Sequence, residues 1–341
     1  MVPRVLVLCT VETGLDAVAE VLRNGFDVAA IAGVRPSVAD SLVISGYTDV
    51  AAFAEKWNIK SVYVNTYSLD HDDDLKVISE INFNLIWVSG WQRLIPDWLI
   101  NLAPLGAVGG HGSPDGIIGG RGRSPQNWAI MLGCKRFDLA LFKIMSGIDD
   151  GPIVAHRSFF YNDYDDISVS YKKAALCCAE MMIEILRNPD LLHFPSQQIG
   201  EPFYYPQRKP EDGYADWNLS VNDIFSHCRA LTRPYPGLRS LFNDRDEIII
   251  WKCQPFDDQV VNVPGSINFV FEDGCFLVQA TDGRLLITDY EVVGLKTSLT
   301  TQVILRSKPF VDTINQIFDR HYEKYPRMQI AQRIRTYGSK T

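Results

Sequence analysis

Two residues with the side chains of an acid–base pair, His111 and Asp149, follow two similar stretches of the sequence. An apolar run at residues 105–108 leads into a glycine-rich turn that carries His111, and a second run at residues 139–145 leads into a turn that carries Asp149. In an open α/β sheet the strand ends meet at the crevice where ligands bind. The two side chains would then form a general base and its charge partner. On spacing alone, a surface histidine and an unrelated turn aspartate are the alternative.

Composition narrows the class of protein. The 341 residues are enough for about two domains. The net charge of −8, with no Lys/Arg-rich block, argues against nucleic acid as the main partner. Seven cysteines without a C-x-x-C motif indicate a reducing compartment, with neither a disulfide framework nor a zinc site. With no 18-residue apolar run and no cleavable leader, we expect a soluble cytoplasmic protein that does not bind a membrane.

The first half of the chain alternates between short apolar runs and helical patterns. All-apolar runs of this length are typical of buried parallel strands. Strands are predicted at residues 5–9, 26–34, 62–64 and 84–90, and helices at residues 14–23, 49–57, 73–82, 97–102 and 171–186. This pattern predicts a Rossmann-like, open, mostly parallel sheet with helices on both faces. No G-x-G-x-x-G follows the first strand, so a nicotinamide site is not predicted.

Two polar stretches in this half have competing interpretations. The acidic cluster at residues 70–74 surrounds His71, and we interpret it as a solvated helix start, with a metal site as the alternative. The glycine-rich residues 119–123 allow backbone N–H groups to approach a ligand closely. Ser124 and Pro125 then predict a helix start, with Ser as N-cap and Pro at the first helical position.

The second half has a different pattern. Residues 189–213 are rich in proline and polar residues and predict a linker, followed by a helix at 221–231. Strands are predicted at residues 247–251, 266–271, 275–279 and 284–288, with hairpin turns at Asp273-Gly274 and Asp282-Gly283. We therefore expect four parts: an N-terminal catalytic domain at 1–188, a linker and connecting helix at 189–240, a small OB-like β-barrel at 241–306, and a helix and basic tail at 307–341.

The motifs, taken together, resemble those of the folate-dependent formyltransferase family. That family places Asn-x-His after a strand, then Arg-Gly, and later Asp-x-Gly at a strand end. The corresponding segments here are residues 109–111, 121–122 and 149–151. The pattern Arg-Gly-x-Ser-Pro-x-Asn-Trp-Ala at residues 121–129 resembles the sugar formyltransferase branch. Segments at residues 207–213, 216–217, 229–231 and 234–237 extend the resemblance to nearly the whole chain.

The resemblance implies an activity and a set of site residues. N10-formyltetrahydrofolate would donate a formyl group to a primary amine on a nucleotide-linked amino sugar, with His111 as base or oxyanion stabiliser and Asp149 as its support. The predicted cofactor contacts are Gly90, Trp91, Arg93, Leu94, Ile95, Ile144 and Asp149. The predicted substrate contacts are Gly109, Ser113, Arg121, Asn127 and Arg208. No metal is expected, and a homodimer is compatible with the sequence. For Trp91, Leu94 and Ile95, a core position is the alternative interpretation, and it is compatible with contact to the cofactor.

Two departures leave the activity open. Gly109 stands where the family has a catalytic asparagine, and the loop from His111 to Arg121 is about two residues longer. Loss of one oxyanion donor typically lowers the rate by about 10²–10³. A backbone N–H of the glycine-rich loop or the Asn127 amide could replace that donor, and a glycine could be required there by a positive φ or by filled space. The alternatives are a methionyl-tRNA or other small-amine formyltransferase, and a catalytically impaired relative that binds folate or nucleotide.

Overall fold

The computed structural model describes residues 2–42, 44, 46–242, 246–294 and 299–338. The chain forms two compact units, each assembled from separated stretches. The first comprises Met1–Arg121, Arg136–Phe160 and Tyr171–Glu201, and the second comprises Gly122–Lys135, Tyr161–Ser170 and Pro202–Thr341. The sequence-based domain boundaries remain a prediction, but these units divide the chain differently, because the second takes two short segments from the middle of the predicted catalytic domain.

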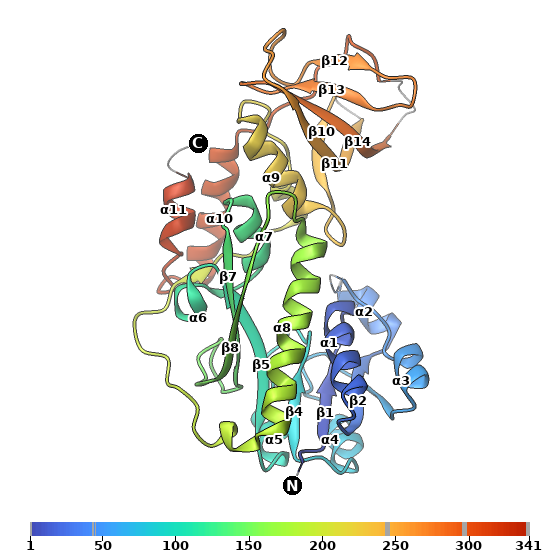
Figure 1. Cartoon of the computed structure of the whole chain (residues 1–341), viewed down its shortest axis with the longest axis vertical. Coiled ribbons are helices and arrows are strands. Elements are labelled where there is room, and N and C mark those ends of the chain that lie inside the picture. The colour runs from blue at the N-terminus through green and yellow to red at the C-terminus, as the bar shows by residue number, and fades with distance from the viewer. Residues whose placement is uncertain (1, 43, 45, 243–245, 295–298, 339–341) are drawn as a thin grey trace. The chain divides into compact units, whose positions relative to one another are not determined.

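A seven-stranded sheet forms the centre of the first unit (Figure 1). Its strands are β1 (Val5–Leu8), β2 (Val28–Val34), β3 (Ser61–Val64), β4 (Leu85–Val88), β5 (Ala107–Ser113), β7 (Arg136–Lys143) and β8 (Ile153–Phe160). Their spatial order is β3-β2-β1-β4-β5-β7-β8. The first five pair in parallel, whereas β7 and β8 pair antiparallel at the edge. The expected open, mostly parallel sheet is confirmed.

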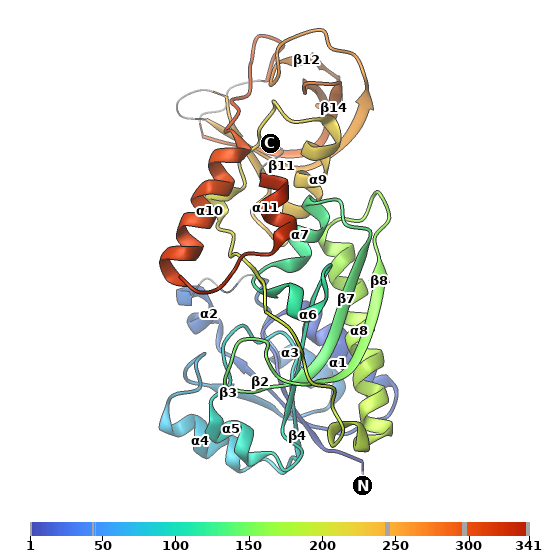
Figure 2. The ribbon, with the colours of Figure 1, turned by 90° about the vertical axis from the view of Figure 1, so that its left-hand side faces the viewer.

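Helices cover both faces of this sheet. They are α1 (Glu12–Arg23), α2 (Pro36–Leu42), α3 (Ala51–Trp57), α4 (Asp72–Ser79), α5 (Asp97–Leu102), α6 (Gly116–Gly119) and α8 (Ile167–Arg187), of which residues 171–187 belong to this unit. Alternate strand residues such as Leu6 and Ala30 pack with Ile78 of α4 and Leu99 of α5 in one core cluster. Figure 2 shows α1 and α8 on the opposite side of the sheet from α4 and α5. The helices α1, α3, α4, α5 and α8 lie where the apolar periodicities predicted helices, whereas α2 and α6 were not predicted.

The strand that carries His111 differs from the sequence expectation. The glycine-rich segment was predicted to be a turn, but β5 continues through it to Ser113 and pairs with β7. Glycine makes this pairing possible, because a Cβ on Gly112 would lie only 2.3 Å from the carbonyl oxygen of Asp138. The strand β8 was not predicted either. Its sequence contains His156, Arg157 and Ser158, which are tolerated because β8 is an edge strand.

The second unit contains a five-stranded antiparallel sheet in the order β10-β11-β14-β13-β12. The strands are β10 (Leu238–Leu241), β11 (Glu247–Asp257), β12 (Ile267–Val270), β13 (Phe276–Gln279) and β14 (Arg284–Val293). Two hairpins lie where Asp-Gly pairs predicted them, between β12 and β13 and between β13 and β14. This separate sheet fits the expected barrel-like domain.

Helices and short elements complete the second unit. The helices are α7 (Pro125–Met131), α9 (Val221–Leu231), α10 (Phe310–Lys324) and α11 (Gln332–Gly338). The short elements are the 3-10 turn η2 (Pro210–Asp212) and the strand β9 (Tyr204–Tyr205), which pairs with β6 (Arg121–Gly122). Another 3-10 turn, η1 (Pro189–Leu192), lies in the first unit. The region predicted as a linker thus contains regular structure. Pro125 opens α7 as predicted, but Ser124 is in the left-handed region at φ 56° and its side chain makes no capping hydrogen bond.

Candidate active site

His111 lies in β5, opposite Ala140 of β7. Its side chain is largely buried, with an exposed fraction of 11%. On the preceding residue, a Cβ at Gly110 would lie 3.2 Å from the Cys178 sulfur. Burial raises the pKa of the Cys178 thiol to about 12, so this neighbouring sulfur stays protonated and is not a nucleophile. His111 is therefore the candidate acid–base residue of this part of the strand.

Asp149 lies in the turn between β7 and β8. Its carboxylate Oδ2 is 3.5 Å from His111 Nδ1, and its side-chain exposure is 22%. The turn is tight: a Cβ on Gly151 would lie only 1.7 Å from the Lys143 carbonyl oxygen, so only glycine fits there. The structure thus brings together the two residues that the sequence paired.

The contact of the second ring nitrogen of His111, Nε2, shows which nitrogen carries the hydrogen of the neutral ring. Nε2 is 2.9 Å from the carbonyl oxygen of Gly120. A carbonyl oxygen only accepts hydrogen bonds, so Nε2 carries a hydrogen. Nδ1 is then the nitrogen that can gain a proton, and it faces the Asp149 carboxylate. The neutral imidazole retains a lone pair on Nδ1 for use as a base, and the carboxylate lies beside this nitrogen.

Gly109 has no side chain to donate a hydrogen bond, and the space beside it is occupied. A Cβ at this position would lie 2.5 Å from Ile144 Cδ1 and 3.6 Å from Val88 Cβ. Gly109 is not among the described residues with positive φ, so its backbone does not require glycine. Of the two reasons considered for the glycine, filled space applies, although the neighbour is Ile144 rather than the longer loop.

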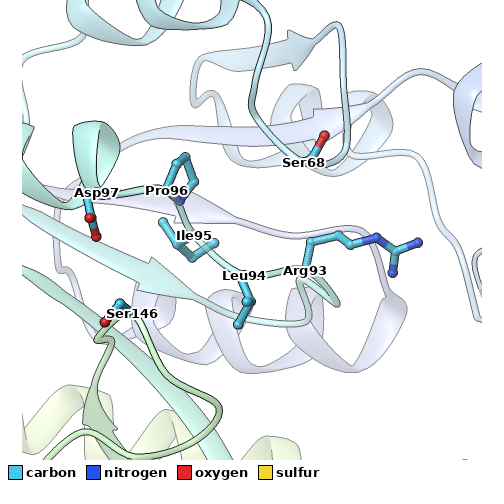
Figure 3. A pocket seen from close by; sticks show the side chains of 7 residues that line it. All are labelled: Ser68, Arg93, Leu94, Ile95, Pro96, Asp97 and Ser146. Atoms are coloured by element: carbon cyan, nitrogen blue, oxygen red, sulfur yellow. The ribbon is translucent and has the colours of Figure 1, made fainter. Parts of the chain in front are cut away.

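An open pocket of about 470 Å³ lies at the turn before α5. Its lining residues are Ser68, Arg93, Leu94, Ile95, Pro96, Asp97 and Ser146. Figure 3 shows that Ser146 comes from a separate segment and faces the stretch from Leu94 to Asp97, while the Arg93 side chain points away from them. The pocket therefore joins both segments predicted to hold the cofactor, the turn after β4 and the residues that lead to Asp149.

Two predicted cofactor residues, Gly90 and Trp91, are not among the residues that line the pocket. Trp91 is 7% exposed and packs edge-on against Tyr67, with ring centroids 4.7 Å apart. Gly90 has φ +90°, and a Cβ there would lie 2.3 Å from a methyl carbon of Val11. Leu94, by contrast, is 61% exposed. The core interpretation thus holds for Trp91, whereas Leu94 is accessible to a ligand.

The predicted substrate contacts other than Gly109 are buried or already hydrogen-bonded. In the first unit, Ser113 is fully buried, and its hydroxyl donates to the carbonyl oxygen of Gly116 at 2.6 Å. Arg121 is 8% exposed, and its Nη2 donates to Gln198 Oε1 at 2.8 Å. Direct substrate contacts by these two side chains remain predictions, but their hydrogen bonds indicate roles in holding the loops.

The other two predicted contacts, Asn127 and Arg208, lie in the second unit. Asn127 is 1% exposed and donates to the carbonyl oxygen of Ala230 at 2.6 Å. Arg208 donates to the Asp212 carbonyl oxygen at 2.7 Å and lies over the Trp128 ring. Burial lowers the pKa of its guanidinium to about 10. One of the two N–H groups of the Asn127 amide is thus bound to a carbonyl of its own unit.

Two expectations about ions and membranes can be compared with the described residues. Nowhere in the described part of the chain do three or more His, Cys, Asp or Glu residues form a group suited to a metal ion. His71 instead caps α4, where its Nδ1 accepts a hydrogen bond from the Asp73 backbone at 3.2 Å. Among the same residues, every helix is too short or too polar to cross a bilayer.

Sequence reasoning missed two groups at this site, the Gly120 carbonyl and the Gln198 side chain. The Gln198 amide nitrogen donates to the carbonyl oxygens of Asp149 and Gly151, at 3.0 and 2.7 Å. A backbone carbonyl has no signature in the residue type, and Gln198 lies in a stretch that was interpreted as a linker. Only the fold reveals these contacts.

Comparison with known proteins supports the expected family. Residues 208–307 match the family described as the formyl transferase C-terminal domain. The fold is similar to that of HypX from Aquifex aeolicus in complex with tetrahydrofolic acid, with a TM-score of 0.61 and 18% identity over 93% of this chain and 48% of that one. The chain thus spans about half the length of the HypX protein.

Two further solved structures are similar over nearly their whole length. An N-formyltransferase from Helicobacter canadensis, in complex with folinic acid and dTDP-3-aminofucose, has a TM-score of 0.56 and 14% identity, covering 85% of this chain and 100% of that one. Methionyl-tRNA formyltransferase from Clostridium thermocellum has a TM-score of 0.52 and 16% identity, covering 86% and 99%. The chain therefore has the fold of formyltransferases and a C-terminal domain that matches theirs.

Proposed function

We propose that the protein transfers a formyl group from N10-formyltetrahydrofolate to a primary amine. The observation that carries this proposal is the His111 ring, which is held between the Asp149 carboxylate and the Gly120 carbonyl with one nitrogen available as a base. The formyltransferase fold and the match of residues 208–307 support the same reaction.

The pocket before α5 fits a folate. It is open, has a volume of about 470 Å³, and combines apolar side chains with the backbone of a turn. Leu94 offers an exposed apolar surface to a planar ring, and Ser146 leads along the chain toward Asp149. We propose that the pterin binds here, so that the formyl group reaches the His111–Asp149 pair.

The chemistry assigns one task to each member of the pair. When bound, the cofactor supplies an activated formyl carbon, whose bond to N10 breaks as its bond to the amine forms. His111 Nδ1 accepts the proton that the attacking amine loses, and Asp149 stabilises the charged ring. The proton on Nε2 stays with the Gly120 carbonyl, which keeps the ring oriented. The proton held on Nδ1 then passes to N10, the leaving nitrogen, so that no proton is gained or lost over the whole reaction.

For the acceptor, we propose an amine on a nucleotide-linked sugar. The support is the similarity to the Helicobacter canadensis enzyme, whose structure contains dTDP-3-aminofucose, and the sugar-branch pattern at residues 121–129. The net charge of −8 disfavours a tRNA acceptor, since tRNA binding requires a basic surface.

The test is a formylation assay with a panel of acceptors. The protein is incubated with N10-formyltetrahydrofolate and either dTDP-, UDP- or GDP-linked amino sugars or methionyl-tRNA, and both released tetrahydrofolate and the formylated product are measured. We expect turnover with an amino sugar, its loss in His111→Asn, and normal turnover in His156→Asn. The control is matched, because His156 also faces an aspartate, at 3.7 Å, but is 50% exposed at the sheet edge. Folate binding without formylation of any acceptor would instead identify a non-catalytic relative.

A further inference from the structure

Gln198 belongs to a short segment, residues 196–198, that is tied to the sheet of the first unit. The backbone N–H and C=O of Ser196 both pair with Ile153 at the start of β8, each at 2.8 Å. This pairing brings the chain alongside the turn that contains Asp149. Gln197 is exposed, whereas Gln198 is half-buried. The segment therefore presents one of its two glutamines to the candidate site.

The Gln198 amide makes three hydrogen bonds with good distances. Its nitrogen donates to the carbonyl oxygens of Asp149 and Gly151, at 3.0 and 2.7 Å, and its oxygen accepts from Arg121 Nη2 at 2.8 Å. These bonds use both N–H donors of the amide and one of the two acceptor sites of its oxygen. Gln198 thus bridges the Asp149 turn and the strand β6.

The bridge acts on a residue whose backbone conformation is unfavourable. Asp149 has φ 48°, in the left-handed region that residues other than glycine rarely adopt. Such a conformation persists when surrounding contacts determine it. Gln198 binds the carbonyl of this very residue, and that carbonyl is fixed to the same Cα as the carboxylate facing His111. Holding the carbonyl therefore helps to hold the carboxylate.

The other end of the bridge acts on the second partner of the imidazole. Arg121 follows Gly120, whose carbonyl accepts the hydrogen bond from His111 Nε2. Arg121 is only 8% exposed, so its position depends on the few groups that it contacts. One side chain, Gln198, is consequently linked to both groups that orient the ring.

We propose that Gln198 is a positioning residue that aligns the Asp149 carboxylate and the Gly120 carbonyl on the two nitrogens of His111. Its effect on catalysis rests on the formyl transfer proposed above, whereas its effect on the His111 ring does not. The residue makes no contact with the reacting atoms. It acts by keeping the Asp149 carboxylate beside Nδ1, where the carboxylate stabilises the proton that this nitrogen gains.

Two substitutions separate this role from a purely structural one. Gln198→Ala removes all three hydrogen bonds. Gln198→Glu keeps an oxygen for Arg121 but replaces the amide donor with a carboxylate that faces two carbonyl oxygens. If Gln198 only satisfied Arg121, the Glu variant would behave like the parent. If it positions Asp149, both variants are impaired. Gln197→Ala is the matched control, because it changes the exposed neighbour on the same segment.

The first readout is the ring signal of His111 in ¹H–¹⁵N NMR of the full chain, identified among the six histidines by its loss in His111→Asn. In Gln198→Ala and Gln198→Glu we expect this signal to move toward its position in Asp149→Asn, while the His156 signal stays in place. The second readout is steady-state formyl transfer. There we expect kcat to fall about tenfold or more with KM changed less than threefold, because base alignment is impaired but ligand contacts are kept.

The outcomes are distinct. An unmoved His111 signal in both variants, or parent-like behaviour of the Glu variant, overturns the proposal. A moved signal in a protein whose parent shows no formyl transfer supports the positioning role and rejects the proposed function instead. A moved signal together with a fall in kcat supports both. Equal effects of Gln197→Ala would show that the whole segment matters only for folding, and would also overturn the proposal.

Discussion

Replacing Gly109 with asparagine tests why a family-typical oxyanion donor is missing. A Cβ at position 109 would lie 2.5 Å from Ile144 Cδ1 and 3.5 Å from its Cγ1. Since Cδ1 is the free end of a side chain, Ile144 can turn aside, and the overpacking should cost about 1–3 kcal/mol of stability. We expect the displaced Ile144 side chain, whose Cγ1 stays close, to keep the amide from the formyl oxygen. We therefore expect Gly109→Asn alone to leave kcat/KM unchanged or lower.

The decisive variant combines Gly109→Asn with Ile144→Ala. Removing the outer carbons of Ile144 makes room for the amide. Because Ile144 is half-buried, its truncation alone should cost roughly 1–3 kcal/mol, at or below the ~2–5 kcal/mol of a fully buried isoleucine. A well-aimed donor is worth about 10²–10³ in rate. Allowing for imperfect aim, we expect the double variant to exceed Ile144→Ala by about tenfold in kcat/KM.

The assay measures release of tetrahydrofolate under kcat/KM conditions for the parent, both single variants and the double variant, with thermal melting as the check on folding. The comparison with Ile144→Ala removes the effect of the cavity itself. An acceleration by Gly109→Asn alone would show that Ile144 does not block the site. A double variant no faster than Ile144→Ala would show that a donor is not missing, so that another group, such as a backbone N–H of the glycine-rich loop, already serves.

Three further predictions follow from the structure. His111→Ala and Asp149→Ala should each lower kcat by about 10² or more with folate binding within a few-fold, and a near-normal rate in either would remove that residue from the mechanism. Burial lowers the pKa of His227 from 6.5 to about 3, so between these pH values the unfolded chain binds a proton that the folded chain does not, and the free energy of unfolding falls as the pH drops. Urea unfolding between pH 7 and 4 should show that this free energy depends less steeply on pH in His227→Gln than in the parent, by up to about 1.4 kcal/mol per pH unit, whereas parallel curves would contradict the prediction. A chain ending at Pro236 should still bind tetrahydrofolate, because the pocket lies in the first unit, and loss of folate binding in a folded truncation would refute this expectation. The truncated chain should also melt at a lower temperature, because Trp217 loses the Ser240 hydroxyl that accepts its indole hydrogen.

The sequence predicted the elements whose signal is local. The strands β1 and β4 are continuous apolar runs, and α9 begins and ends where its periodicity does. The two Asp-Gly hairpins depend only on turn chemistry, which four residues specify. These elements do not need knowledge of their neighbours, and for that reason they were found.

What the sequence did not reveal depends on contacts between distant residues. β5 continues through three glycines because β7 pairs with it, and glycine alone does not indicate a strand. The helix α7 lies in the sequence between β5 and β7, yet it packs in the second unit, where Asn127 binds the Ala230 carbonyl 103 residues away. In the candidate site, His111 and Asp149 were identified by motif, whereas the Gly120 carbonyl and Gln198 were not.

The stretch of residues 144–151 contacts the candidate site at both of its ends. At its start, Ile144 fills the space beside Gly109, where the resemblance places an asparagine. At its end, the left-handed conformation of Asp149 and the close approach of Gly151 to Lys143 set the carboxylate opposite His111. A single turn thus sets which side chain lies beside Gly109 and which carboxylate faces His111. Because Gln198 holds the far end of that turn, a change in its hydrogen bonds reaches the histidine without touching any ligand.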